Sequence, residues 1–143
     1  MRHMVERAGL SATYTLDSAG TGAWHVGEHP DPRTVRAAKQ RGYDLAQLRA
    51  RQFTREDFGD FDLVLAMDRS NLAAIERMAK GIAEVPPIVL FRSFDPSAPP
   101  GAEVPDPYSG GPKGFEEVLE MCERACAGLL ALPSARASLY DGV

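Results

Sequence analysis

Cysteine is scarce in this sequence, which contains only two among its 143 residues, Cys122 and Cys126. So few cysteines exclude a small secreted fold that depends on disulfides. The three histidines are scattered along the chain, so the usual ligand spacing of a zinc site is absent as well. We therefore expect no metal and no cofactor, and this cysteine usage predicts a reducing, cytoplasmic setting.

Long apolar runs and an excess of positive charge are also missing. No hydrophobic segment approaches the roughly 18 residues that a membrane span needs. The N-terminal stretch M-R-H-M-V-E-R-A-G-L contains no signal-peptide core. The formal net charge is -4, whereas a nucleic-acid-binding domain is usually basic. The sequence thus predicts no membrane partner and no nucleic-acid partner.

Several motifs of phosphate and acyl chemistry are absent too. The chain has no G-x-x-x-x-G-K-[ST] loop and no G-x-S-x-G elbow. A cysteine phosphatase needs Cys, five residues and Arg, so that a thiolate and a guanidinium both face the phosphate. Six positions after Cys122 stands Gly128, and six after Cys126 stands Leu132. Both cysteines lie within an apolar helical pattern, which predicts small core side chains and not nucleophiles.

Strand patterns and helical patterns alternate along the chain. This alternation predicts an α/β fold with a parallel sheet, and the length suits a single domain. Expected strands cover residues 12–17, 61–67 and 87–91, and expected helices cover residues 1–8, 32–42, 54–59, 70–80 and 114–132. We expect the domain to span residues 1–132 and the tail, residues 133–143, to be frayed.

A stiff loop near the end of the chain holds the first candidate residue. In V-P-D-P-Y-S-G-G, residues 104–111, Asp106 stands between two prolines, which limit φ and present the carboxylate with little conformational freedom. Parallel sheets bind ligands beyond the carboxyl ends of their strands, and this loop follows the last expected strand. Two interpretations are open: an ordinary turn whose Asp side chain caps backbone N–H groups, or a general acid.

Two aromatic residues are candidates for a ligand pocket. Trp24, the only tryptophan, lies among glycines after the first expected strand, and Tyr108 lies two residues after Asp106. Each is either a hydrophobic plug or the wall of a pocket. By contrast, Arg51 and Gln52 are predicted to belong to a solvated segment that leads to a short helix.

Several motifs, taken together and in order, resemble one family. They are D-S-A-G-T at 17–21, W-H-V-G-E-H-P-D-P-R at 24–33, A-R-Q-F-T-R-E-D-F at 50–58, F-D-L-V-L-A-M-D-R-S-N-L at 61–72, F-D-P at 94–96 and V-P-D-P-Y-S-G-G-P-K-G-F-E at 104–116. This set resembles the low-molecular-weight protein tyrosine phosphatases and extends over nearly all of residues 1–132. The resemblance implies a phosphatase-like three-layer fold, a four-stranded parallel sheet with helices on both faces.

The resemblance also implies a chemistry and a set of roles. The family uses a Cys thiolate to attack phosphotyrosine on proteins, or a small aryl phosphate, through a phospho-cysteine intermediate. Asp106 matches the acid that protonates the departing phenolate and then activates water. Tyr108 and Trp24 match the aromatic walls on either side of the substrate ring. Many members have a second tyrosine where this chain has Ser109, so a thinner wall and a different selectivity are expected.

The main departure from the family lies at the start of the sequence. Members begin with a strand, then the Cys-x5-Arg phosphate loop, then a helix, and Met1 matches a position inside that helix. We therefore expect the first, central strand, the nucleophile and the phosphate-binding Arg to be missing, which makes this chain a shortened and inactive form. The gap in the sheet is expected either to close, with the strand at 12–17 pairing with the one at 63–67, or to be filled by another chain in a homodimer.

Two other functions remain open at this point. One is a non-catalytic module that dimerises or binds phosphoproteins through the surviving aromatic walls. The other is a thiol-dependent arsenate reductase, which resembles the phosphatases in fold and needs the same missing loop. The D-P-Y sequence at 106–108 favours the phosphatase.

Overall fold

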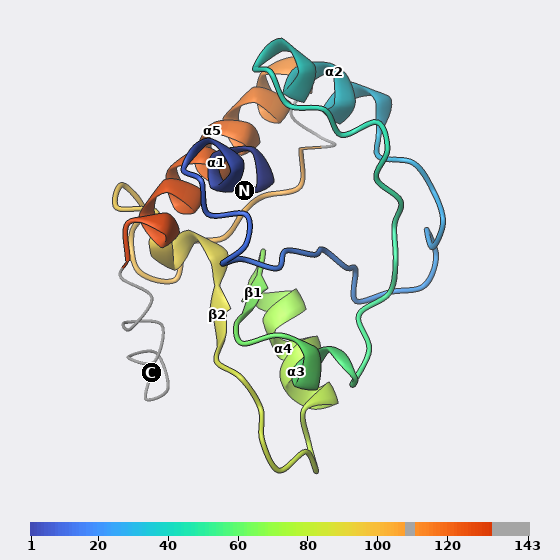
Figure 1. Ribbon diagram of the computed structural model, residues 1–143. Helices are drawn as coiled ribbons and strands as arrows, with labels where there is room; N and C mark the ends of the chain where they lie inside the picture. Colours follow the sequence, from blue (N-terminus) through green and yellow to red (C-terminus); the bar gives the residue numbers. More distant parts are fainter. Residues whose placement is uncertain (108–110, 133–143) are drawn as a thin grey trace. The chain divides into compact units, whose positions relative to one another are not determined.

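The computed structural model describes residues 1–107 and 111–132, without the side chains of Gly111 and Pro112 (Figure 1). In chain order the elements are α1 (Arg2–Arg7), α2 (Pro32–Gln40), α3 (Asp57–Asp60), β1 (Val64–Ala66), α4 (Arg69–Met78), β2 (Ile88–Leu90), the 3-10 helix η1 (Phe91–Phe94) and α5 (Gly111–Leu130). The chain divides into two compact units. Unit 1 contains Met1–Phe53 and Pro105–Glu123, and unit 2 contains Thr54–Val104 and Arg124–Val143. The predicted tail at 133–143 lies outside the described residues.

Unit 2 is built on a parallel strand pair. β1 and β2 pair in the register Val64 with Ile88, Leu65 with Val89 and Ala66 with Leu90. Parallel neighbours need a long crossover connection, and α4 supplies it and packs against both strands. The predicted α/β fold with a parallel sheet is therefore confirmed, and the strands predicted at 61–67 and 87–91 are observed, each shorter than expected.

Side-chain caps explain where two of the helices begin. Oδ1 of Asp68 accepts a hydrogen bond from the Asn71 N–H at 2.7 Å and so caps α4. Oδ1 of Asp31 does the same for the Arg33 N–H at 2.8 Å and caps α2. These bonds satisfy N–H groups that the first turn of a helix leaves without a partner. The start of α2 matches the sequence prediction and α4 begins one residue before the predicted start at 70, because a cap depends only on neighbouring residues.

The strand predicted at residues 12–17 is wrong. Among the described residues the sheet contains β1 and β2 only, and 12–17 forms no ladder with either strand. Instead the N–H groups of Thr13 and Tyr14 both bond the Leu10 carbonyl, which makes a turn directly after α1. A strand forms only where a neighbour accepts its backbone hydrogen bonds. Because 12–17 finds none, the expected closing of the sheet by this segment is also wrong.

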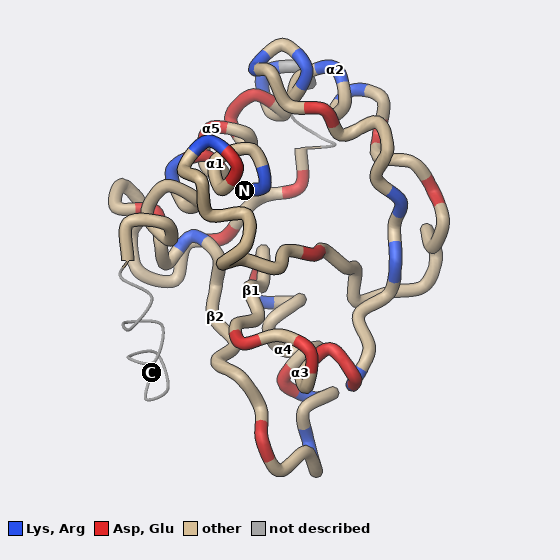
Figure 2. Tube along the Cα trace, viewed as in Figure 1, with Lys and Arg blue, Asp and Glu red and all other residues tan. Residues whose placement is uncertain are grey.

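Charged side chains join α5 to the end of α2 within unit 1. Arg41, which follows α2, forms ion pairs with Glu120 at 2.9 Å and with Glu123. The Tyr43 hydroxyl donates to the other oxygen of Glu123 at 2.8 Å. Figure 2 marks the basic residues of α2 and the acidic residues of α5 along their traces. Two carboxylates of α5 thus share the Arg41 guanidinium, and one of them also accepts from the Tyr43 hydroxyl, which fixes the end of α2 against α5.

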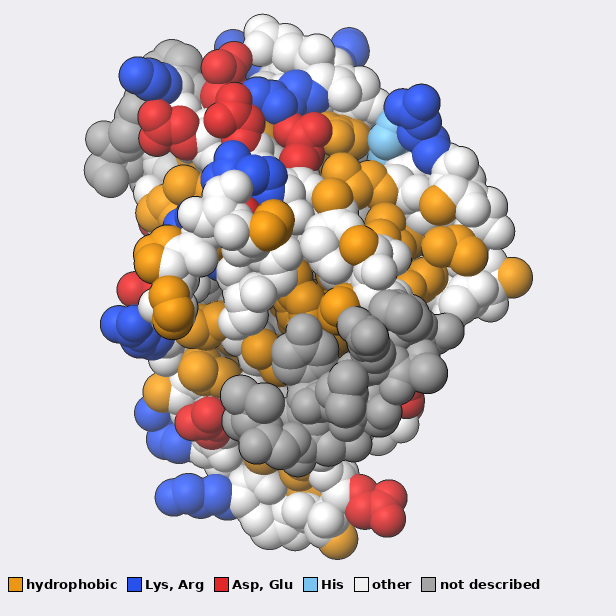
Figure 3. Space-filling view, turned by 90° about the vertical axis from the view of Figure 1, so that its left-hand side faces the viewer, with side chains coloured by type: hydrophobic (Ala, Val, Ile, Leu, Met, Phe, Trp, Pro, Cys, Tyr) orange, Lys and Arg blue, Asp and Glu red, His pale blue; other side chains and the backbone are white. Residues whose placement is uncertain are grey.

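The hydrophobic core of the described residues is small. No large side chain among them is fully buried, and buried apolar residues are spread over both units. Figure 3 shows hydrophobic side chains at the surface over much of the face that it draws. No helix in the described part of the chain combines the length and the hydropathy that crossing a membrane requires. Polar contacts therefore matter more to this fold than the apolar fraction alone suggests.

The most buried carboxylate of unit 2, Asp95, is held by several polar contacts. Asp95 is 3% exposed, and its two oxygens each lie 3.2 Å from Nε of Arg124. Arg92 approaches at 3.6 Å, and the Ser97 N–H donates at 2.9 Å. Burial by itself raises the pKa of Asp95, but the Ser97 amide and the two guanidinium groups together hold that pKa below its ordinary value of 3.8.

Asp95→Asn is expected to lower the free energy of unfolding at pH 7 by about 2–3 kcal/mol, because it leaves the Arg92 and Arg124 charges without their buried counter-charge. The depressed pKa adds stability that is complete above pH 3.8 and is lost as the pH falls through the folded-state pKa. The difference in the free energy of unfolding between the wild type and Asp95→Asn should therefore become smaller in acid. Urea unfolding at several pH values measures this difference, with Asp62→Asn, at an exposed carboxylate, as the matched control. A difference in the free energy of unfolding that is constant with pH would contradict the ionic role of Asp95.

Candidate active site

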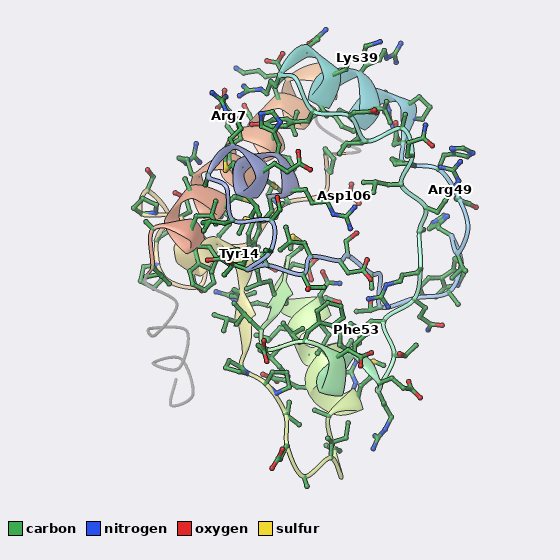
Figure 4. The ribbon with its side chains drawn as sticks, in the orientation of Figure 1. Arg7, Tyr14, Lys39, Arg49, Phe53 and Asp106 are labelled. Carbon is green, nitrogen blue, oxygen red and sulfur yellow. The ribbon has the colours of Figure 1, made fainter. Side chains whose placement is uncertain are left out.

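The predicted general acid lies on the segment that leads into α5. Asp106 is exposed and stands between Pro105 and Pro107 in unit 1, and Figure 4 labels it. The Pro107 carbonyl lies against α5 so closely that a Cβ on Gly114 would be 3.4 Å from its oxygen. Two prolines and this close backbone contact hold the position of Asp106, which suits a carboxylate that must be presented in one place.

Trp24 lies on a loop that the backbone of another segment holds in place. Four hydrogen bonds join residues 20–28 to residues 50–53 within unit 1. They run from Gly20 N–H to Arg51 O at 2.9 Å, Phe53 N–H to Gly20 O at 2.7 Å, Gly27 N–H to Ala50 O at 2.7 Å and Ala50 N–H to Glu28 O at 2.9 Å. The loop that carries Trp24 therefore has a fixed backbone at both ends.

The same segment holds a residue that was expected to lie free in solvent. Nε of Arg51 donates to Oδ2 of Asp17 at 3.0 Å, which adds an ion pair at the base of the Trp24 loop. Gln52 is exposed and Arg51 is half-buried, so the prediction of a solvated segment holds for Gln52, but it did not include the parallel bridge of Gln52 with Gly20. The sequence at 51–54 contains one apolar residue, Phe53, and no regular alternation, so the pattern gave no signal for this pairing.

The Trp24 side chain itself is in solvent. It is 85% exposed, so the interpretation as a hydrophobic plug is wrong. The other interpretation, the wall of a ligand pocket, stays a prediction. An exposed indole on a loop whose backbone is fixed is suited to receive a flat, apolar ligand group.

Only part of the predicted site can be followed in the structure. Tyr108 and Ser109 lie outside the described residues. Trp24 and Asp106 both belong to unit 1, on segments that lie far apart in the sequence, residues 20–28 and 105–107. The structure therefore places an acid and an aromatic ring on two separate segments of one unit.

The two cysteines are not near a phosphate-binding loop. Both lie within α5, Cys122 half-buried and Cys126 5% exposed. Backbone N–H groups in the middle of a helix bond within the helix and cannot surround an anion. Their prediction as small core side chains agrees with this burial.

A separate hollow of about 180 Å³ lies beside α1 in unit 1. Its lining residues are Arg2, Val5, Glu6, Ser11, Tyr14 and Leu16, of which Figure 4 labels Tyr14. Two of these residues are bonded, since the Arg2 guanidinium donates to the Leu16 carbonyl at 2.9 Å. None of the predicted site residues lines this hollow.

Comparison with known proteins gives a consistent result. The model of the family described as "Low molecular weight phosphotyrosine protein phosphatase" matches residues 1–139. The low molecular weight protein-tyrosine-phosphatase of Streptomyces coelicolor is 48% identical over 131 residues, which cover 91% of this chain and 79% of that protein. The corresponding phosphatase of Schizosaccharomyces pombe is 46% identical over 117 residues, 80% of this chain and 72% of that one.

A solved structure agrees with the sequence matches. The protein tyrosine phosphatase of Entamoeba histolytica, crystallised with Hepes in its active site, superposes with a TM-score of 0.80 at 33% identity. The superposition covers 90% of this chain and 81% of that chain. The chain belongs to the low molecular weight phosphotyrosine protein phosphatase family.

Proposed function

We propose that this chain carries the general acid and the aromatic walls of a site for phosphotyrosine proteins or small aryl phosphates, with Asp106 as the acid and Trp24 and Tyr108 as the walls. The exposure of Trp24 is the observation that carries the proposal. An indole that is 85% exposed offers apolar surface whose burial by a ligand would be favourable, and the four backbone bonds at its base fix the loop that presents it.

In the family reaction a Cys thiolate attacks phosphorus and the bond from phosphorus to the phenolic oxygen breaks. Asp106 would give its proton to the departing phenolate oxygen. As a carboxylate it would then take a proton from the water that attacks the phospho-cysteine, so that phosphate leaves and the thiolate is regenerated. The prolines on each side of Asp106 favour both steps, since they reduce the conformational freedom that each proton transfer would otherwise have to restrict.

The nucleophile is the part that these 143 residues do not supply. Neither Cys122 nor Cys126 is followed six positions later by Arg, and both lie on α5 away from any loop. Removing a covalent nucleophile removes the reaction path. We therefore propose that the 143 residues by themselves do not hydrolyse aryl phosphates by this mechanism.

An assay with para-nitrophenyl phosphate tests both parts. The 143-residue chain is expected to show no turnover above buffer. A joined chain, in which the same residues follow a designed β-strand and a Cys-x5-Arg loop, is expected to turn the substrate over, and Cys→Ser in that loop is expected to abolish the gain. Turnover by the 143 residues alone would show that another nucleophile is present. A folded joined chain without turnover would reject Asp106 and Trp24 as parts of the site.

The strand pair of unit 2 favours a second candidate, a non-catalytic module that dimerises. The Val64 N–H donates to the Pro87 carbonyl at 3.0 Å, so in a parallel ladder the next residue, Leu65, turns its N–H and C=O away from β2. Within the described part of the chain no backbone hydrogen bond is seen for Leu65 on that side.

A second copy pairing there would give a dimer by light scattering, and Leu65→Pro would dissociate it. A monomer at all concentrations would reject this candidate.

A further inference from the structure

Gly22 and Trp24 lie closer together than two residues with side chains could. A Cβ built on Gly22 would be 1.7 Å from Cζ3 of Trp24, 2.0 Å from Cε3 and 2.8 Å from Cη2. Carbon atoms that are not bonded approach to about 3.5 Å at best. The benzo edge of the indole therefore occupies the space in which any other residue would have its Cβ.

The backbone does not require glycine at this position. The glycines with positive φ in the described part of the chain are Gly9, Gly27, Gly42, Gly81 and Gly101. Gly22 is not among them, so alanine could adopt its backbone conformation without strain. The nearest atoms that a side chain at Gly22 would meet all belong to the ring of Trp24. A side chain at Gly22 is therefore compatible with the backbone conformation but not with the present position of the Trp24 ring.

A neighbouring glycine of the same loop provides a natural comparison. A Cβ on Gly20 would meet only the carbonyl oxygens of Gly22 at 3.8 Å and Arg51 at 3.9 Å, which is ordinary contact. Gly20 also has no positive φ. Alanine at Gly20 therefore leaves the ring in place, whereas alanine at Gly22 would make the ring turn aside, although both positions lie on the loop that presents Trp24.

We infer that Gly22 is a positioning residue that determines specificity for aryl substrates: its bare backbone seats one edge of the Trp24 indole and so fixes the angle at which the open face of the ring meets the substrate. An exposed tryptophan would otherwise sample several rotamers, and each rotamer lost on binding weakens affinity. Because contact with Gly22 already orders the ring in the free protein, the loss of rotamer freedom occurs on folding and does not weaken binding. The role of Trp24 as a wall is taken from the proposed function, whereas the seating of the ring is a property of the loop itself.

The experiment compares Gly22→Ala with Gly20→Ala in the 143-residue chain. Trp24 is the only tryptophan, so its fluorescence anisotropy decay and its near-UV circular dichroism report on this ring alone. Gly22→Ala is expected to speed the anisotropy decay and to change the near-UV signal. Gly20→Ala should leave both unchanged, and far-UV circular dichroism should show the same fold for all three proteins.

Titration with phenyl phosphate at millimolar concentration then tests the effect on the ligand. The probe is expected to change the Trp24 emission of the wild type, and Gly22→Ala should weaken the apparent affinity about three- to tenfold, the cost of ordering one freed side chain. Gly20→Ala should bind like the wild type. A weaker affinity together with a freed ring supports the inference.

The other outcomes overturn it in distinguishable ways. If the anisotropy decay of Gly22→Ala equals that of the wild type, Gly22 does not seat the ring. If the ring is freed but the wild-type affinity is kept, the seat does not determine specificity. If the wild-type emission does not respond to phenyl phosphate at all, Trp24 is not a substrate wall, and the proposed function fails at that residue while the seating of the ring is judged by the anisotropy alone.

Discussion

Asp106→Asn in the joined chain is expected to lower kcat for phenyl phosphate by about 100- to 10,000-fold, the usual contribution of a positioned general acid. Asparagine has nearly the same shape as aspartate but has no acidic proton to give. The loss should be smaller with para-nitrophenyl phosphate, because nitrophenolate is a good leaving group and needs little protonation as it departs. The ratio of the two losses, measured under saturating substrate, reports the acid role directly.

The alternative interpretation of Asp106 as a turn residue predicts a different pattern. Asparagine forms the same side-chain turns as aspartate, so a turn role would leave Asp106→Asn active with both substrates and would make Asp106→Ala less stable. Glu117→Gln is a suitable control, since Glu117 is an exposed carboxylate on α5 in the same unit. Equal losses for the two substrates in Asp106→Asn would argue against proton transfer to the leaving group.

Elements that depend on neighbouring residues could be predicted from the sequence. Asp68 and Asp31 cap helices through side chains that reach only two or three residues along the chain, so their signals are complete in the sequence. The segment at 12–17 has strand-forming residues, yet it forms no ladder within the described structure. Strand formation needs a partner elsewhere in the chain, and β propensity says nothing about whether that partner is present.

The candidate site residues and the contacts around them also differ in how far they could be predicted from the sequence. Asp106 and Trp24 could be named as candidates because their motifs are local and match one family, and their roles stay predictions. The contribution of Asp95 could not be predicted in this way, because its partner Arg124 is 29 residues away. The pair of Arg51 and Asp17 spans 34 residues. Gly22 was missed for another reason: its importance lies in the absence of a side chain opposite one ring, which no composition or pattern reveals.

Gly128→Ala is expected to destabilise unit 2 more than any conservative surface change. A Cβ at this position of α5 would lie 1.8 Å from the Phe94 carbonyl oxygen and 2.9 Å from its carbon. The obstacle is backbone, so it cannot rotate aside as the end of a side chain would. Phe94 is 6% exposed and Cys126, two residues before Gly128, is 5% exposed, so η1 or α5 would have to move within packed surroundings. We expect a loss of about 3 kcal/mol in the free energy of unfolding, the upper part of the usual range for overpacking.

A second glycine of unit 2 makes the matched control. Gly59 lies in α3, and a Cβ added to it would have nothing within 4 Å. Gly59→Ala should raise stability by about 0.5–1 kcal/mol, since alanine loses less backbone freedom in a helix. Helix propensity alone would give Gly128→Ala the same favourable sign. Urea unfolding followed by far-UV circular dichroism therefore separates the two causes. Opposite signs for the two variants establish that α5 carries glycine at 128 because the Phe94 backbone requires the space, and a Gly128→Ala midpoint at or above the wild type would disprove it.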